Sequence, residues 1–175
     1  SKNLNSNISQ QLFYLLVLVL FLRIDLIFQD NTPTGGDMGA HIVAIDTFIK
    51  DFMPNFQING WSNDWFGGYP LYYFYFPLPP LITFFLNLVF PFGVAFKIMV
   101  AMSTILVVYS FEKLMRKTSN QFSISGASAG LFYVFTESFT IYGGNLAYTM
   151  AGQFYFGYSL AFANLSIFYL IKSKN

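Results

Sequence analysis

The stretch VAFKIMVAMSTILVVYSFE, residues 94–112, is apolar over nearly its whole length, and the basic cluster KLMRK follows it at 113–117. An apolar run of about 20 residues is long enough to cross the hydrocarbon core of a bilayer as a helix. Lysine and arginine gather at the cytoplasmic ends of such helices. The stretch therefore predicts a transmembrane helix whose basic end faces the cytoplasm.

The composition of the whole chain agrees with this interpretation. Of its 175 residues, 55% are hydrophobic and only 10% are charged, and the mean hydropathy is +0.51, whereas soluble domains average about 25% charged residues. There is no cysteine and only one histidine, which excludes disulfides, thiolate sites and zinc sites built on several imidazoles. The nine scattered basic residues and the net charge of +1 indicate no nucleic-acid partner. A divalent ion held by carboxylates stays open.

Four further apolar runs flank the first, and together the five predict an all-α integral membrane protein with four or five transmembrane helices. Residues 11–28 are typical of an uncleaved signal anchor, and residues 71–90 are interrupted by prolines. Residues 122–141 carry Glu137, and an ionisable group within an apolar run is a candidate functional residue. If the proline-broken run does not fully cross, the basic residues share the cytoplasmic side and loop 29–70 is extracytoplasmic, which is the topology we favour. The alternative is that the whole protein is inverted and the loop is cytoplasmic. These runs are residues 11–28, 71–90, 122–141 and 154–171.

The polar loop 29–70 contains a sixteen-residue amphipathic segment, residues 38–53, that ends before Pro54. Apolar side chains recur in it at helical spacing, so we expect a helix too short to span, lying in the membrane interface with its apolar face towards lipid. Asp37 stands just before it, after Gly35 and Gly36, which we expect to supply the bend into the helix. Aspartate at this position typically caps a helix, and the alternative is a general base or a ligand of a divalent ion. His41 follows one turn later, as a helix-stabilising partner or a second polar group of the same site.

Aromatic residues are dense over residues 59–80. They favour either an aromatic belt at the headgroup level or a stacking platform for a sugar or lipid headgroup, in which Trp61 and Trp65 stack and Asp64 binds hydroxyls. The glycine-rich break 142–153 is typical of close helix packing. Its alternative is a polar contact surface for substrate made by Asn145 and Gln153.

Three blocks of this sequence, GGDMGAH (35–41), GWSNDWFGGYPLYYFYFPLPPL (60–81) and GGNLAYTMAGQF (143–154), occur in an order that resembles a bacterial integral membrane family described as "6-pyruvoyl-tetrahydropterin synthase-related". The resemblance covers roughly residues 34–160. Its arrangement is similar to the N-terminal part of GT-C-type glycosyltransferases, which use polyprenyl-phosphate sugars. By position, the resemblance implies that Asp37 is the catalytic base or the ligand of a divalent cation, Mg or Mn. It also implies a location in the bacterial inner membrane.

Two function classes follow from these expectations. In the first, the chain is a GT-C-like module that transfers a sugar from a lipid-phosphate donor on the extracytoplasmic side, in contact with membrane lipid. The substrate would be bound by His41, Trp61, Asp64, Trp65, Asn145 and Gln153. In the second, the chain is a non-catalytic subunit that packs against other membrane subunits. A transporter is disfavoured because few polar residues lie in the spans and no repeat is visible. Because GT-C enzymes have many more spans, we expect the chain to be part of a longer one.

Overall fold

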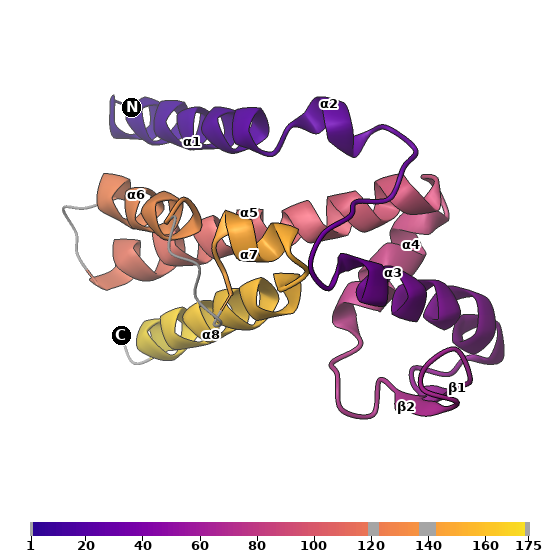
Figure 1. Ribbon diagram of the computed structural model, residues 1–175. Helices are drawn as coiled ribbons and strands as arrows, with labels where there is room; N and C mark the ends of the chain where they lie inside the picture. The colour runs from indigo at the N-terminus through magenta and orange to yellow at the C-terminus, as the bar shows by residue number, and fades with distance from the viewer. Residues whose placement is uncertain (1, 119–122, 137–142, 174–175) are drawn as a thin grey trace. The chain divides into compact units, whose positions relative to one another are not determined.

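The computed structural model describes residues 2–118, 123–136 and 143–173, and these are mostly helical (Figure 1). In chain order the elements are α1 (Lys2–Phe21), α2 (Ile24–Ile27), α3 (Met38–Thr47), the π-helix η1 (Phe48–Phe52), the 3-10 turn η2 (Met53–Asn55), β1 (Gly60–Ser62), β2 (Tyr69–Leu71), α4 (Leu78–Asn87), α5 (Phe92–Thr118), α6 (Ser123–Val134), α7 (Leu146–Met150) and α8 (Phe154–Ser173).

The chain forms two compact units. One, here the helical unit, comprises residues 1–28 and 100–175, and the other, here the hairpin unit, comprises residues 29–99. One boundary between them falls inside α5. Each unit is described by itself below.

Among the residues that the structure describes, two helices are long and apolar enough to cross a membrane, judged by length and composition. They are residues Phe92–Met115 of α5, with a hydropathy of 2.0, and Phe154–Ser173, which is α8, with a hydropathy of 1.4. They include the apolar runs 94–112 and 154–171, so the prediction of helices there is confirmed. Shorter apolar helices are formed by Leu12–Phe21 and Leu78–Asn87.

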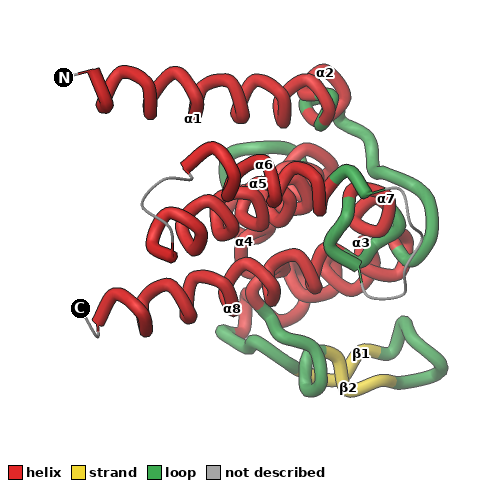
Figure 2. The backbone as a smooth tube through the Cα atoms, turned by 90° about the vertical axis from the view of Figure 1, so that its left-hand side faces the viewer, coloured by secondary structure: helices red, strands yellow, loops and turns green. Residues whose placement is uncertain are grey.

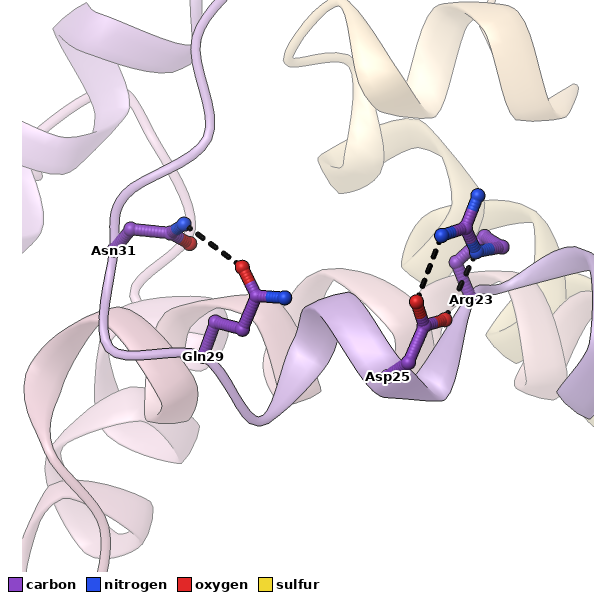
Figure 3. Close-up of polar contacts among 4 residues, drawn as sticks. All are labelled: Arg23, Asp25, Gln29 and Asn31. Atoms are coloured by element: carbon purple, nitrogen blue, oxygen red, sulfur yellow. Dashed lines mark hydrogen bonds and ion pairs between the residues drawn. The ribbon is translucent and has the colours of Figure 1, made fainter.

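The predicted single helix over residues 11–28 is wrong, because the chain turns between α1 and α2. Arg23 lies in the left-handed region with φ 49°. Its guanidinium donates to both carboxylate oxygens of Asp25, at 2.9 and 2.7 Å, and both side chains are exposed (Figure 3). This bidentate pair between residues two apart holds the local bend. A break here leaves α1 without the last third of the predicted span.

The other two apolar runs also give shorter helices than expected. The run 71–90 does not form one helix: α4 begins only at Leu78, with prolines in its first turn, where a missing N–H leaves no helical hydrogen bond unmade. This agrees with the expectation that prolines break this run. In the run 122–141 the described helix is α6, and Glu137 lies outside the described residues.

The helical unit is packed through small residues that face α5. An added Cβ on Gly130 would lie 2.9 Å from Val108 Cα, and one on Gly126 would lie 3.0 Å from Glu112 Cα. These two glycines are four residues apart on α6, so one face of this helix approaches the α5 backbone closely. The neighbouring core cluster consists of Leu18, Val107, Val108, Val134 and Ala161.

Helix α8 packs on α5 with the same spacing on both helices. A Cβ on Gly157 would lie 3.2 Å from Ser103 Cβ, and seven residues further along each helix the buried Asn164 Nδ2 donates to Ser110 Oγ at 3.1 Å. Because the residue numbers of both partners increase from the first contact to the second, the two helices run parallel. A buried amide that finds a hydroxyl partner avoids the cost of an unmade hydrogen bond.

The core of the hairpin unit is built on α3 and η1. The predicted apolar stripe is present, but it packs within the protein: Ile45 is fully buried and Phe52 is 4% exposed, and the neighbouring Phe48 is fully buried as well. The prediction that this face lies in lipid is therefore wrong. Because the two aromatic rings meet others of the same unit, protein takes the place that the bilayer was expected to fill. The core cluster here is Ala44, Phe48, Phe52, Leu71 and Tyr72.

A two-stranded antiparallel hairpin in this unit corrects the all-α prediction (Figure 2). Strand β1 pairs with β2 so that Gly60 faces Leu71 and Ser62 faces Tyr69. Short strands beside glycine-rich turns carry little periodic signal, which explains why the sequence analysis did not find them. The loop between the strands, residues 63–68, contains two of the residues proposed as substrate ligands.

The first turns of α5 hold the segment that enters the hairpin unit. Lys97 Nζ donates to Gln29 O at 2.6 Å and to Asn31 Oδ1 at 2.7 Å. One turn earlier, a Cβ added to Gly93 would lie 2.6 Å from Asn31 O. Gly93 and Lys97 share a face of α5. The glycine allows the backbone of Asn31 to approach this helix closely, and the hydrogen bonds of the lysine hold the segment there. Figure 3 shows Asn31, which also donates to Gln29 Oε1 at 3.4 Å.

We expect Gly93→Ala to destabilise the hairpin unit by about 1–3 kcal/mol, because its Cβ would meet backbone atoms of Asn31 that cannot give way. The matched control is Gly39→Ala in α3, where an added Cβ meets nothing within 4 Å. That change should stabilise by about 0.5–1 kcal/mol, since alanine restricts the unfolded chain more than glycine does. Unfolding in detergent followed by circular dichroism would measure both. Equal effects would contradict the close packing at Gly93.

Candidate functional site

Asp37 is placed at the start of α3 by two glycines. Gly35 and Gly36 have φ of 120° and 49°, backbone conformations that glycine adopts without strain, so the predicted bend is confirmed. Asp37 occupies the N-cap position, and its carbonyl accepts the His41 N–H at 3.1 Å. Its side chain makes no capping hydrogen bond, however, so the prediction that the carboxylate caps the helix is wrong. The exposed carboxylate is not held by the backbone amides of the first turn.

His41 lies one turn into α3 and is half-buried. Its ring meets that of Tyr75 edge-on, with centroids 6.3 Å apart and an interplanar angle of 62°. This contact ties the first turns of α3 to the segment that follows β2. Tyr75 is a site neighbour that the sequence analysis did not single out, because 34 positions separate the two rings in the chain.

Asp64 joins the hairpin to the other end of α3. Its Oδ2 accepts from Thr47 Oγ1 at 3.2 Å, and its backbone N–H donates to Ser62 Oγ at 3.3 Å. Thr47 is the last residue of α3, whereas Asp37 precedes the first. Ten helical residues rise by about 15 Å. The two carboxylates therefore lie at opposite ends of this helix, too far apart to contact one sugar ring.

Trp61 presents an aromatic face on the hairpin. It is 63% exposed, its Nε1 donates to Asn63 Oδ1 at 3.1 Å, and its ring lies directly against Gly68. Close contact with a residue that has no side chain, together with the hydrogen bond, sets the orientation of the indole. An oriented and solvent-facing indole is suited to stack on an apolar sugar face.

We expect Gly68→Ala to displace the Trp61 ring, because the added Cβ would overlap the indole and φ at this position is 139°. The matched control is Gly67→Ala, also at positive φ (75°) but with nothing within 4 Å of its Cβ. Both changes cost about 1–2 kcal/mol of backbone strain. Only Gly68→Ala should alter the tryptophan bands of the near-ultraviolet circular dichroism. The same spectral change in both variants would exclude an effect specific to the indole contact.

Trp65 lies in the same loop and is half-buried. Its ring packs on Phe66 with centroids 6.0 Å apart, and its buried Nε1 has no hydrogen-bond partner. A buried donor without an acceptor costs about 1–3 kcal/mol. Asp64 and Trp65 thus share the loop that follows β1, the strand containing Trp61, but Trp65 is more buried than Trp61.

Asn145 and Gln153 belong to the helical unit, around α7. Asn145 is 4% exposed; its Oδ1 accepts the Tyr148 N–H at 2.9 Å, and its Nδ2 donates to Thr136 O at 3.0 Å. It is the N-cap of α7, a structural role that explains its burial. Gln153 is half-buried and its N–H donates to Tyr148 O at 2.9 Å.

The glycine pair before α7 supports the close-packing interpretation of this segment. Gly143 and Gly144 have φ of 72° and 92°, and the Tyr133 hydroxyl donates to Gly143 O at 3.1 Å. An added Cβ on Gly143 would lie 3.1 Å from Phe156 Cβ and 3.3 Å from Gln153 Cβ. Side chains of α6 and α8 thus approach the glycine backbone, as a packing role requires.

Charge in the hairpin unit is mostly negative: it contains five aspartates and two lysines. Asp46 Oδ2 accepts from Lys50 Nζ at 2.7 Å, and this hydrogen bond raises the pKa of Lys50 above its ordinary value. Among the described residues, no group of three or more histidine and acidic side chains could hold a metal ion. A divalent ion at Asp37 would therefore need most of its oxygen ligands from a bound phosphate and from water.

Comparison with protein-family models, with curated proteins and with solved structures finds no match to this chain.

Proposed function

We propose that the chain is a GT-C-like glycosyltransferase module with four or five membrane spans, in which Asp37 acts as general base on the extracytoplasmic side of a bacterial inner membrane. The observation that carries the proposal is the exposed carboxylate of Asp37, held at a helix start by two glycines without serving as its cap. A carboxylate exposed at the start of a helix can reach an acceptor hydroxyl and take its proton. The resemblance of the three sequence blocks supports the same residue.

The reaction is transfer of a sugar from a lipid-phosphate donor. The acceptor hydroxyl gives its proton to the Asp37 carboxylate and its oxygen attacks the anomeric carbon. The bond from that carbon to the phosphate oxygen breaks, and lipid phosphate leaves with the electron pair. His41 would bind the leaving phosphate one turn along α3. Asp37 alone supplies too few ligands to hold a divalent ion, so its proposed role in this step is that of a base.

The hairpin would hold a remote part of the substrate. Because Asp64 and Trp61 lie at the far end of α3 from Asp37, they suit a second sugar of an acceptor chain rather than the reacting ring. Trp61 would stack on that sugar, and the Asp64 carboxylate would accept from its hydroxyls while keeping its bond from Thr47. Trp65, Asn145 and Gln153 remain predicted ligands with less exposed side chains.

The experiment compares Asp37→Asn with wild type in the full-length protein, reconstituted in vesicles and supplied with short-chain polyprenyl-phosphate hexoses. Released polyprenyl phosphate is the readout. The matched control is Asp46→Asn, which removes a carboxylate already paired with Lys50. Transfer that is unaffected by Asp37→Asn, or equally lowered by both changes, would overturn the proposed base.

A second function, a non-catalytic subunit of a membrane assembly, is favoured by the outer face of α8. Only 28% of the apolar stretch of this helix is buried within the chain. Ile167 and Leu170 are 46% and 64% exposed. Further helices of a longer chain or of other subunits would cover this face. Co-purification with a defined complex, without any loss of its function in Asp37→Asn, would support this role over the enzyme.

A further inference from the structure

Four consecutive aromatic residues between β2 and α4 form an exposed segment, here the aromatic loop (residues 73–76). Tyr73 is 60% exposed, Phe74 80%, Tyr75 54% and Phe76 36%. Removing apolar surface from water is worth about 25 cal/mol per Å². Four such rings facing water would not gain this free energy of burial. An apolar or amphipathic surface that covers the loop would therefore stabilise it.

The aromatic loop is held in this exposed position from both sides. Just before it, Tyr72 is 6% exposed, has φ 62° and packs edge-on against Phe48 with centroids 5.3 Å apart. Just after it, Pro79 and Pro80 are buried in the first turn of α4. With a buried anchor at each end, the loop cannot fold its rings back into the core. Its exposure follows from the way the unit is built.

No charged residue or histidine occurs from residue 65 to residue 96, although much of this stretch is exposed. Besides the aromatic loop, Phe85, Leu88 and Val89 near the end of α4 are 63%, 69% and 78% exposed. The stretch runs directly into α5, one of the two helices fit to cross a membrane. An uncharged, exposed surface continuous with such a helix is suited to lipid, whereas charged side chains normally cover a water-facing surface.

We propose that the aromatic loop is a membrane-interface anchor that inserts into the headgroup region of a zwitterionic bilayer. Tyrosines prefer this depth because their rings face the acyl chains while their hydroxyls reach water and headgroups. The excess of aspartates in the hairpin unit opposes binding to anionic lipid, so the anchor works through aromatic burial rather than through charge. The His41–Tyr75 contact then connects the start of α3 to the anchored loop.

The absence of cysteine from the sequence makes this proposal directly measurable by single-site spin labelling. The test variant is Phe74→Cys in the full chain, with a nitroxide attached and the protein reconstituted in phosphatidylcholine vesicles. The matched control is Phe56→Cys. Phe56 is also a loop phenylalanine, 97% exposed, but it stands between Asn55 and Gln57. Collision rates with oxygen, which concentrates in lipid, and with a water-soluble nickel chelate are measured at both positions.

We expect the ratio of oxygen to nickel collision rates to be about tenfold higher at position 74 than at position 56, the ratio that a difference of about 1.4 kcal/mol produces. Adding phosphatidylglycerol should not increase it. Equal ratios at the two positions would overturn the anchor, because the loop would then face water. Protection of position 74 from both reagents would also overturn it, in favour of a protein partner. If Phe74→Cys misfolds, Tyr73→Cys tests the same proposal, with circular dichroism checking the fold of each variant.

Discussion

Asp37→Asn should lower the turnover number for sugar transfer by about 10²–10⁴-fold, the range that a positioned general base contributes. Asparagine has nearly the same shape and is equally accepted at a helix N-cap. The Asp37 side chain makes no capping hydrogen bond in the first place. The substitution therefore removes the proton acceptor and leaves the geometry of α3 in place. We expect KM to change much less than kcat, since the role of the carboxylate lies in the transition state.

The stability of this variant distinguishes a chemical role from a structural one. The free energy of unfolding should stay within about 0.5 kcal/mol of the wild-type value, as is usual for substitutions at exposed positions. A loss of about 1 kcal/mol, typical of a deleted cap, would show that the carboxylate serves the helix after all. Measuring turnover and unfolding on the same preparation keeps these outcomes apart. Asp46→Asn, whose carboxylate is paired with Lys50, gives the reference for removing one negative charge from α3.

Gly130→Leu should destabilise the helical unit by about 3 kcal/mol, the upper part of the usual range for overpacking. A Cβ at this position would already lie 2.9 Å from Val108 Cα and 3.2 Å from Phe111 Cβ. Because the first of these atoms is backbone, the two helices must separate to admit a larger side chain. Separation would open the core cluster that contains Val108 and Val134. Unfolding by dodecyl sulfate in mixed micelles, followed by far-ultraviolet circular dichroism, would measure the loss.

The control on the same helix is Phe132→Ala, at a side chain that is 79% exposed. It should change the free energy of unfolding by less than about 0.5 kcal/mol, because most of this side chain is exposed. Gly130→Ala should fall between the two, since it adds only the first carbon of the leucine side chain. A gain in stability for Gly130→Leu would mean that α6 does not approach α5 as closely as the glycines indicate.

Long apolar runs were the most predictable part of this fold. Residues 94–112 and 154–171 become α5 and α8 because their side chains are mostly apolar and no proline intervenes. The prediction of one helix over residues 11–28 was wrong because an average hydropathy hides the two charged residues Arg23 and Asp25. Their ion pair lies where the backbone turns between α1 and α2. Residues 126–130, GASAG, have a glycine at each end, a small-residue motif that is typical of close helix packing. This motif was visible in the sequence but was not among the predictions.

The candidate site was predictable in its parts but not in its arrangement. The glycine bend before Asp37 followed from the conformational freedom of glycine, and Trp61 and Asp64 belong to the same hairpin because they are neighbours in sequence. The placement of Asp64 at the opposite end of α3 depends on the hydroxyl of Thr47, a contact across 17 positions. Likewise, the apolar stripe of α3 indicated a buried face, but periodicity alone does not distinguish protein from lipid as the covering material.

The π-helix η1 has a consequence for how this segment tolerates insertions and deletions. Such wider turns hold one more residue than an α-helix needs, so deleting a single residue within Phe48–Phe52 would let α3 continue as a regular helix. Because the wide turn already absorbs this extra residue, the side chains beyond such a deletion would keep their direction. Deleting one residue from α3 itself would instead rotate them by about 100°, and Phe52 would then leave the core cluster. The wide turn therefore lets this segment lose one residue without changing the direction in which the hairpin points.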